Sequence, residues 1–170
     1  MVGVQTVIND NPNLTCRIEG GTNPVRIICD SNLRIPKNCN IVNTAQEVPT
    51  IIATVSDDSK RTKFFEQRGI EVIKSAKKDG RVDLNDLMFK LGEKKIDGIL
   101  LEGGGTLNMS ALEAGIVNHI QAYIAPKIFG GSGLYNPVKG IGVKNPDEAF
   151  ICRNVKISNI GDDIFIECDL

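Results

Sequence analysis

The sequence is poor in the side chains that most often hold metal ions or attack substrates. It has one histidine, His119, and five cysteines in 170 residues, and no two cysteines lie within four residues of each other. Zinc sites need closely spaced ligand pairs, and a disulfide framework usually needs an even number of cysteines. We therefore expect no metal, reduced thiols, a cytoplasmic protein, and a structural role for His119.

Long apolar runs and an excess of one charge are also missing. Twenty Lys and Arg stand against 21 Asp and Glu, which gives a net charge of −1. Such a balance does not suit a protein that coats nucleic acid or an anionic membrane. No apolar stretch approaches the about 18 residues of a membrane span, and the N-terminus has no signal-peptide pattern. The length predicts a single globular domain, residues 1–170, that binds neither nucleic acid nor membranes.

Strand-like and helix-like segments alternate over the first two thirds of the chain. The predicted strands are short β-branched or apolar runs over residues 24–29, 50–55, 70–73 and 99–101. The predicted helices follow residues 56–58 as far as Gly69, Asp83 as far as Gly92, and Leu107 as far as Gly115. Residues 99–101 contain no polar side chain, which indicates a strand buried on both faces of a parallel sheet.

The C-terminal third has a different pattern. Apolar and polar residues alternate over 120–124, 155–158 and 164–168, and residues 161–163 make a turn between the last two runs. These two runs predict an antiparallel hairpin that closes the sheet. The whole chain therefore predicts an α/β fold of three layers, in which helices cover both faces of a mixed sheet.

A glycine-rich loop is the first candidate binding site. Glu102-Gly103-Gly104-Gly105-Thr106 follows the predicted strand 99–101 and opens a helix. Glycines let a phosphate approach the backbone, and the free N–H groups of a helix N-terminus attract anions. The loop lacks the Gly-Lys-Ser/Thr of a Walker loop and the G-x-G-x-x-G order of a Rossmann fold. Phosphate binding and a tight turn without a ligand both remain open.

Two further loops are weaker candidates. Residues 6–17 are rich in Asn, Asp and Pro and end in Arg17, whose guanidinium fork suits a phosphate or a carboxylate. A polar loop of this kind is more often only a connection. Residues 129–133, Phe-Gly-Gly-Ser-Gly, favour a flexible surface loop over a binding loop.

Four stretches of the sequence together resemble a known family. They are Met1-Val2-Gly3 running into Thr6-Val7-(x2)-Asp10-Asn11-Pro12-(x)-Leu14-Thr15-(x)-Arg17; Asp30-Ser31-(x2)-Arg34-Ile35-Pro36; Glu102-Gly103-Gly104-(x)-Thr106-Leu107; and Tyr123-Ile124-Ala125-Pro126-Lys127-(x2)-Gly130-Gly131. Over nearly its whole length the chain resembles the reductase domain of the bifunctional riboflavin-biosynthesis deaminase/reductase, a relative of dihydrofolate reductase. The first and third motifs are specific when they occur together.

The resemblance implies a reaction, a cofactor and two sets of site residues. It implies an NADPH-dependent reductase that converts the ribosyl group of 5-amino-6-(5-phosphoribosylamino)uracil to a ribityl group. The residues implied to bind NADPH are Thr6, Asp10, Ser31, Gly104, Gly105, Thr106, Leu107, Asn108, Met109 and Ser110. The residues implied to bind the phosphorylated substrate are Leu14, Arg17 and Glu102. No catalytic residue is assigned, because the cofactor carries the hydride chemistry.

The chain also departs from the family pattern. Neither the family's deaminase domain nor the strand, loop and helix that open its reductase domain are found in these 170 residues. We therefore expect an N-terminally truncated domain with an incomplete substrate pocket. Two alternatives follow: a nucleotide-binding fragment without turnover, and a dihydrofolate-reductase-like enzyme with another substrate. The resemblance also suggests a homodimer, to which the C-terminal strands contribute, and a deaminase domain in the parent chain.

Overall fold

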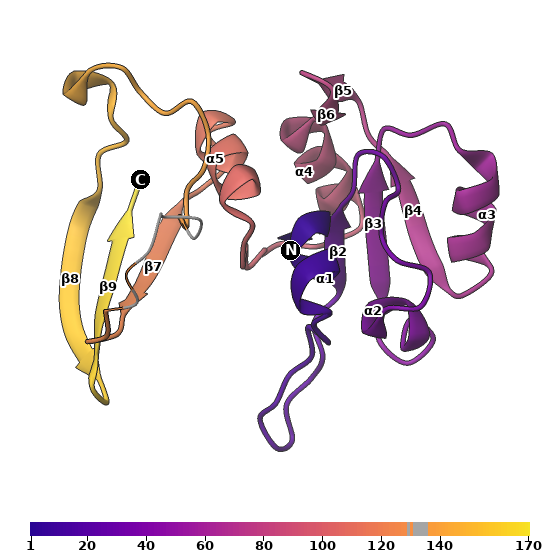
Figure 1. Cartoon of the computed structure of the whole chain (residues 1–170), viewed down its shortest axis with the longest axis horizontal. Coiled ribbons are helices and arrows are strands. Elements are labelled where there is room, and N and C mark those ends of the chain that lie inside the picture. Colours follow the sequence, from indigo (N-terminus) through magenta and orange to yellow (C-terminus); the bar gives the residue numbers. More distant parts are fainter. Residues whose placement is uncertain (129, 131–135) are drawn as a thin grey trace.

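The computed structural model describes residues 1–128, 130 and 136–170, and its first half is built on a parallel sheet (Figure 1). The four strands are β1 (Val2–Gly3), β2 (Arg26–Cys29), β3 (Thr50–Thr54) and β4 (Ile70–Lys74). They lie in the order β1-β2-β3-β4, and each neighbouring pair is parallel. All four carboxyl ends therefore meet at one edge of the sheet. The predicted strands 24–29, 50–55 and 70–73 are confirmed.

Five α-helices lie in the part of the chain that the structure describes. They are α1 (Val4–Asp10), α2 (Asn40–Asn43), α3 (Ser59–Glu66), α4 (Leu84–Glu93) and α5 (Gly105–Glu113). A short 3-10 helix, η1 (Pro146–Glu148), lies further along the chain. The predicted caps are confirmed, because Asp58 accepts the N–H of Arg61 at 3.0 Å and Asp83 accepts the N–H of Asn85 at 2.9 Å. None of the described helices is long and apolar enough to cross a membrane.

Apolar side chains pack against both faces of the parallel sheet, because residues alternate along β2 and β3. On one face, Ile28 and Ile52 are fully buried together with Val7 of α1 and Phe65 of α3. The opposite cluster joins the sheet to α4 and α5, and its buried members include Ile27, Ile51, Ala53, Leu84, Leu87, Leu91 and Ala111. The predicted layering of helices on both faces is confirmed.

The last third of the chain forms an antiparallel sheet. Its strands are β7 (His119–Ile124), β8 (Arg153–Ile160) and β9 (Asp163–Asp169), and they lie in the order β7-β9-β8. The predicted C-terminal hairpin is thus β8–β9. Within the described residues, backbone pairing does not join this sheet to the parallel one, so these seven strands form two sheets where the sequence predicted one (Figure 1).

Residues 99–101, predicted as a strand buried on both faces, do not form a regular strand. The segment runs beside β1, where the Glu102 N–H donates to the Met1 carbonyl at 3.0 Å and the Gly3 N–H donates to the Gly103 carbonyl at 3.1 Å. No described strand pairs with its other side, and Leu100 is 67% exposed. The apolar run therefore lies at the edge of the sheet with hydrogen bonds to β1 alone, and this edge position leaves Leu100 exposed.

Two other segments differ from expectation. Residues 6–10, predicted to open a polar loop, lie in α1, which ends at Asn11 in the left-handed conformation (φ 43°). Residues 77–82 form an unpredicted hairpin of β5 (Lys77–Lys78) and β6 (Arg81–Val82). The 129–133 loop lies, except for Gly130, outside the described residues.

Candidate functional site

A cleft of about 650 Å³ opens at the carboxyl ends of β1 and β2. Helix α1, the first turn of α5 and the β5–β6 hairpin line it. Gly3 and Cys29, the last residues of the two strands, also lie in its wall. Ligands of open α/β sheets bind at this edge, and the volume suits a cofactor or a small substrate.

The glycine loop places the N-terminus of α5 in this cleft. Gly104 is the N-cap of α5 at φ 88°, and among the described residues no side chain caps the helix. The N–H groups of Gly105 and Thr106 donate to no residue that the structure describes. Such N–H groups carry a partial positive charge, so this end of α5 fits a pyrophosphate.

The remaining contacts of the loop fix its position. The Lys139 N–H donates to the Gly105 carbonyl at 2.8 Å, and the Asn108 side chain donates to the Pro137 carbonyl at 2.8 Å. A Cβ on Gly105 would stand 2.5 Å from the carbonyl oxygen of Asn136, which is too close for any side chain. Position 105 therefore requires glycine for packing against the 136–139 segment, whereas position 104 requires it for a left-handed backbone.

Most of the residues implied to bind NADPH are gathered in the cleft. The eight that line it are Thr6, Asp10, Ser31, Gly104, Gly105, Thr106, Leu107 and Ser110. Asn108 does not line it and turns to Pro137, and Met109 is buried and faces a second, adjoining cavity. Residues that are far apart in the sequence thus meet around one helix N-terminus.

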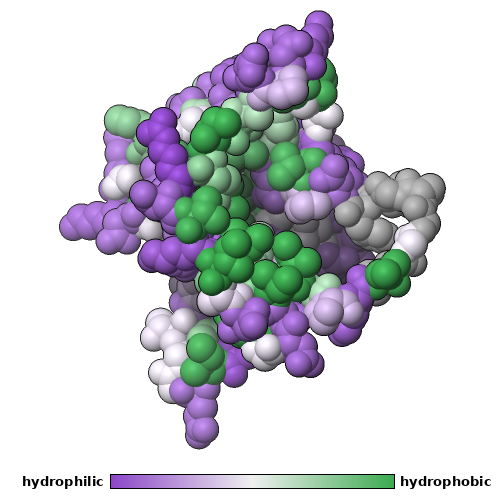
Figure 2. Space-filling model, turned by 90° about the vertical axis from the view of Figure 1, so that its left-hand side faces the viewer, coloured by the Kyte–Doolittle hydropathy of each residue, from purple (hydrophilic) through white to green (hydrophobic). Residues whose placement is uncertain are grey.

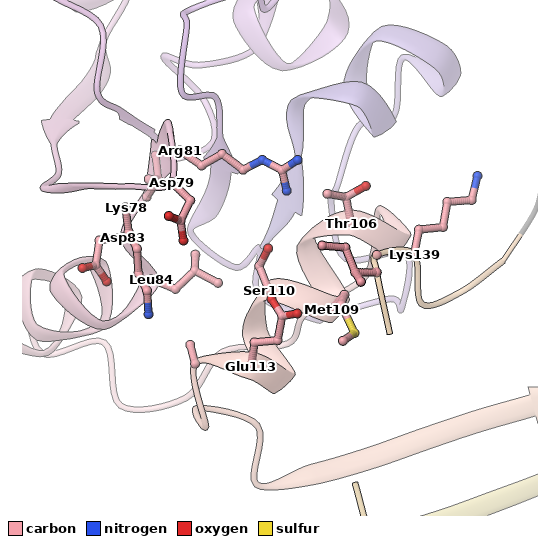
Figure 3. A pocket seen from close by; sticks show the side chains of 14 residues that line it. Lys78, Asp79, Arg81, Asp83, Leu84, Thr106, Met109, Ser110, Glu113 and Lys139 are labelled. Atoms are coloured by element: carbon pink, nitrogen blue, oxygen red, sulfur yellow. The ribbon is translucent and has the colours of Figure 1, made fainter. Parts of the chain in front are cut away.

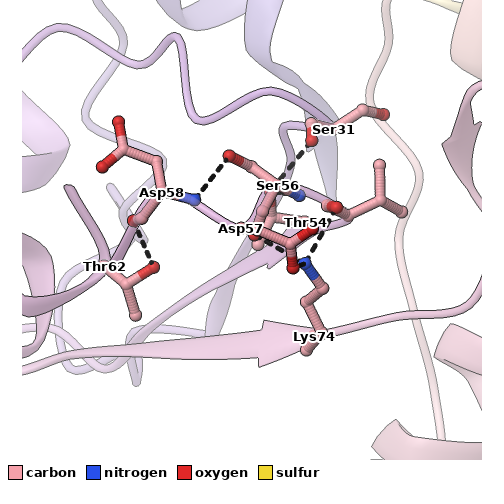
Figure 4. A network of polar contacts seen from close by, with 8 residues as sticks. Ser31, Thr54, Ser56, Asp57, Asp58, Thr62 and Lys74 are labelled. Carbon is pink, nitrogen blue, oxygen red and sulfur yellow. Dashed lines mark hydrogen bonds and ion pairs between the residues drawn. The ribbon is translucent and has the colours of Figure 1, made fainter. Parts of the chain in front are cut away.

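Ser31 is held in place by a network at the end of β3 (Figure 4). Its carbonyl accepts the Thr54 hydroxyl at 3.0 Å and the Val55 N–H at 3.2 Å, and its hydroxyl accepts the Val82 N–H at 3.1 Å. The preceding Asp30 is fully buried and accepts the N–H of Ile35 at 2.7 Å. Ser31 therefore occupies a rigid turn that also anchors the β5–β6 hairpin.

The ionisable groups near the cleft do not form a nucleophile or a metal site. Burial raises the pKa of the Cys29 thiol to about 12, so it stays protonated at neutral pH. His119 lies on β7 and bonds to Asp169 at 2.8 Å, away from the cleft lining. Across the described residues, no group of three or more His, Cys, Asp and Glu side chains could hold a metal ion.

The residues implied to bind substrate are not brought into the cleft. Leu14 packs against the core cluster under α1. Glu102 pairs with Met1 through its backbone, and its side chain is exposed. Arg17 lies in the connection between α1 and β2. Their substrate roles therefore stay predictions.

Sequence reasoning missed several residues that line the cleft: Asn9, Asn32, Arg34, Arg81 and Lys139. A signal for the hairpin that carries Arg81 was present. Asp79 and Gly80 have positive φ values of 48° and 79°, the conformation of a type I′ turn, and Asp-Gly is a preferred sequence for that turn. The two-residue strands on either side were too short to stand out.

The fold and the cleft define an α/β protein with a candidate ligand site at the carboxyl edge of a parallel sheet, beside the glycine-rich start of a helix. Comparison with protein families gives the particular family. The RibD C-terminal domain matches residues 1–166, and the chain belongs to that family. The fold class predicted from the resemblance is confirmed by solved relatives.

Named relatives cover almost the whole chain. The riboflavin biosynthesis protein RibD of Actinobacillus pleuropneumoniae is 48% identical over 98% of this chain, which spans 44% of that protein. The 2,5-diamino-6-ribosylamino-4(3H)-pyrimidinone 5′-phosphate reductase of Methanothermobacter thermautotrophicus is 36% identical, with 98% of this chain and 77% of that protein covered. The chain thus spans less than half of the RibD proteins that it matches.

A solved structure shows the same fold. The deaminase/reductase of Thermotoga maritima superposes with a TM-score of 0.80 and 24% identity, covering 99% of this chain and 44% of that one. At this identity the likeness speaks for the fold alone.

Proposed function

We propose that the chain is an NADPH-dependent reductase domain of riboflavin biosynthesis, which reduces the ribosyl group of 5-amino-6-(5-phosphoribosylamino)uracil to ribityl. The observation that carries the proposal is the open N-terminus of α5 in a cleft at the carboxyl edge of the sheet, in a chain of the RibD C-terminal domain family. A relative named as a reductase of 2,5-diamino-6-ribosylamino-4(3H)-pyrimidinone 5′-phosphate supports a reduction of the same kind on a closely similar substrate.

The chain's own residues fit the cofactor at three places. The N–H groups of Gly105 and Thr106 can donate to the pyrophosphate oxygens. Thr6 and Asp10 of α1 and Ser31 after β2 line the cleft, where their side chains can bind ribose hydroxyls. Leu107 adds apolar surface for a ring. These contacts orient the cofactor and keep water from its reactive face.

Opening of the sugar ring breaks the bond between the anomeric carbon and the ring oxygen, moves a proton from nitrogen to that oxygen and leaves a carbon–nitrogen double bond. NADPH, when bound, would supply the hydride that the anomeric carbon takes up, and the nitrogen would take a proton. The nitrogen–carbon bond remains, the sugar is reduced by two electrons, and NADP⁺ is the oxidised product.

Gly104→Asp tests the cofactor part of the proposal. The new carboxylate would stand at the helix N-terminus where the pyrophosphate binds, so we expect NADPH affinity to fall at least about 100-fold. Gly115→Asp is the matched control, because Gly115 also has a positive φ (66°) but ends α5 outside the cleft. Titration calorimetry measures both variants. Unchanged affinity in Gly104→Asp would contradict the proposed site.

A second candidate is a nucleotide-binding domain without turnover. It is favoured by the position of Leu14, Arg17 and Glu102 outside the cleft. The assay is substrate-dependent NADPH oxidation by this chain and by the same chain with the family's preceding segment added. Turnover by the 170-residue chain would reject this candidate, and turnover by the extended chain only would support it.

We also propose a homodimer through the C-terminal sheet, a single domain and a cytoplasmic location. Ile124, Ile157 and Ile164 share one face of that sheet and are 49%, 69% and 43% exposed. Figure 2 looks at the end of the molecule that carries β8 and shows apolar side chains gathered at its centre. A second copy of the chain, with the same apolar face, would cover them.

A further inference from the structure

Two of the five cysteines lie next to each other in the C-terminal sheet. Cys168 is buried in β9, and Cys152 is exposed directly before the first residue of β8. The other three cysteines belong to the parallel half of the chain: Cys16, Cys29 and Cys39. Cys152 and Cys168 are therefore far apart in the sequence but neighbours across two paired strands.

The register of β8 and β9 explains why the two cysteines meet. Arg153 stands opposite Asp169, so Cys152 and Cys168 take the diagonal positions on either side of that pair. A β-bulge follows, because β8 has two residues between Arg153 and Lys156 where β9 has only Cys168. Bulges increase the local twist of a strand pair and are built features of a fold.

The bulge is held in one conformation. Asn154, the first of its two residues, has a left-handed backbone with φ 51°. Its side chain donates to the Asp169 carboxylate at 2.9 Å, and the same carboxylate bonds to His119 of β7 at 2.8 Å. All three strands therefore fix the end of the sheet at which the two cysteines lie.

The two thiols interact and differ in their access to solvent. The pKa of Cys168 is raised to about 11, first by a hydrogen bond with the Cys152 thiol and then by burial. Cys168 is only 4% exposed, whereas Cys152 is open to solvent. Because the thiolate is the attacking form of cysteine, Cys168 does not react readily with a reagent in solution at neutral pH. Cys152 is the thiol that such a reagent reaches first.

Cys152 also ends the segment that packs against the glycine loop. Within this segment the Lys139 N–H donates to the Gly105 carbonyl at 2.8 Å. Figure 3 shows Lys139 beside the part of α5 that carries Thr106 and Met109. A covalent bond at Cys152 would fix the far end of this segment to β9.

We propose that Cys152 and Cys168 form a disulfide within one chain when a small-molecule disulfide oxidises the protein. With glutathione disulfide, Cys152 loses its proton and attacks one sulfur, which forms a mixed disulfide and releases one glutathione. Cys168 then loses its proton and attacks the Cys152 sulfur, which forms the new bond and releases the second glutathione. The two thiols give up two electrons, and the glutathione disulfide takes them up. The proposal does not depend on the reductase reaction.

The test is mass spectrometry with peptide mapping of the whole chain after incubation with glutathione disulfide and an acid quench. In the wild type we expect the peptides that contain positions 152 and 168 to be joined, with a loss of two hydrogens and no glutathione on either. Cys168→Ser should keep one glutathionyl group on Cys152, because no second thiol displaces it. Cys39→Ser removes a buried cysteine of the parallel half and should behave like the wild type at both positions.

A second measurement reads the effect of the bond on the fold. A disulfide that closes a loop of this length restricts the unfolded chain, so oxidation should raise the midpoint of urea unfolding of the wild type by about 1 M. The midpoint of Cys152→Ser should not change on oxidation. A wild-type chain that kept glutathione on Cys152 beside a free Cys168 thiol would overturn the proposal. A disulfide that joined two chains on a non-reducing gel would overturn it as well.

Discussion

The two larger sheets of this molecule bury their strands very differently. Every residue of β3 is buried, whereas every residue of β8 is exposed. The parallel half has helices on both faces and carries its own core, and the antiparallel half leaves apolar side chains in solvent. The difference indicates that the candidate cleft rests on the half that has its own core, and that the exposed apolar side chains of the other half suit the proposed dimer contact.

The largest effect should come from Arg26, a buried cation at the start of β2. Its guanidinium makes six hydrogen bonds, to Asn13, Ile41, Thr44, Val48 and Thr50. Burial lowers the pKa of Arg26, and these acceptors hold the charge. Arg26→Met leaves buried carbonyls without donors, so we expect a loss of about 3–5 kcal/mol of unfolding free energy in urea titrations.

Arg153→Met in β8 is the control for this comparison. Arg153 is exposed, so its replacement should change the unfolding free energy by less than about 0.5 kcal/mol. If Arg26→Met and Arg153→Met lost the same amount of unfolding free energy, the difference in burial between the two halves would not determine their contributions to stability.

Ile157→Glu tests the exposed half. Ile157 pairs with Ile166 in the β8–β9 register and lies on the apolar face, so a carboxylate there should weaken dimerisation by about 2 kcal/mol or more, roughly 30-fold. Ser158→Glu places the same charge on the opposite face and should leave the association constant unchanged. Sedimentation over a concentration series measures both. If the wild-type chain stayed monomeric at high concentration, the proposed dimer contact through this face would be wrong.

Much of the fold could be read from local pattern. The β-branched runs and the caps Asp58 and Asp83 marked most of the parallel half, because each signal acts within a few residues. The prediction of a buried strand over residues 99–101 was wrong, because the burial of a strand depends on the segments that lie beside it in the fold. The composition of three residues does not show which segments those are.

The site was predicted only where a motif carried it. The glycine loop predicted the start of a helix. The family resemblance added Thr6, Asp10 and Ser31, and the fold brings these three residues to the same cleft. Arg81 carried no motif of its own. It matters because a hairpin bends it over the cleft, and only the tertiary hydrogen bond between Val82 and Ser31 reveals that position.

The smallest predicted effect compares two carboxylates, one in each half. Asp86 accepts hydrogen bonds from Lys90, Ala76 and Ser75, and the pKa of Asp86 is lowered by them, most by Lys90. The pKa of Asp169 is also lowered, by Asn154 and then by His119. Asp86 ties α4 to the end of β4 and is 27% exposed, whereas Asp169 is 48% exposed.

Because both pKa values are lowered on folding, each carboxylate stabilises the fold above its ordinary value of 3.8, and the effect is lost as pH falls through the folded value. Asp86→Asn should lose about 1–2 kcal/mol at neutral pH, and its gap to the wild type should close as pH falls below 3.8 in urea titrations. Asp169→Asn should lose less, because solvent screens its partners. If the difference in unfolding free energy between Asp86→Asn and the wild type did not change with pH, Asp86 would act through packing and not through its charge. If Asp169→Asn lost more unfolding free energy than Asp86→Asn, the charged carboxylate of Asp169 would contribute more to stability than that of Asp86.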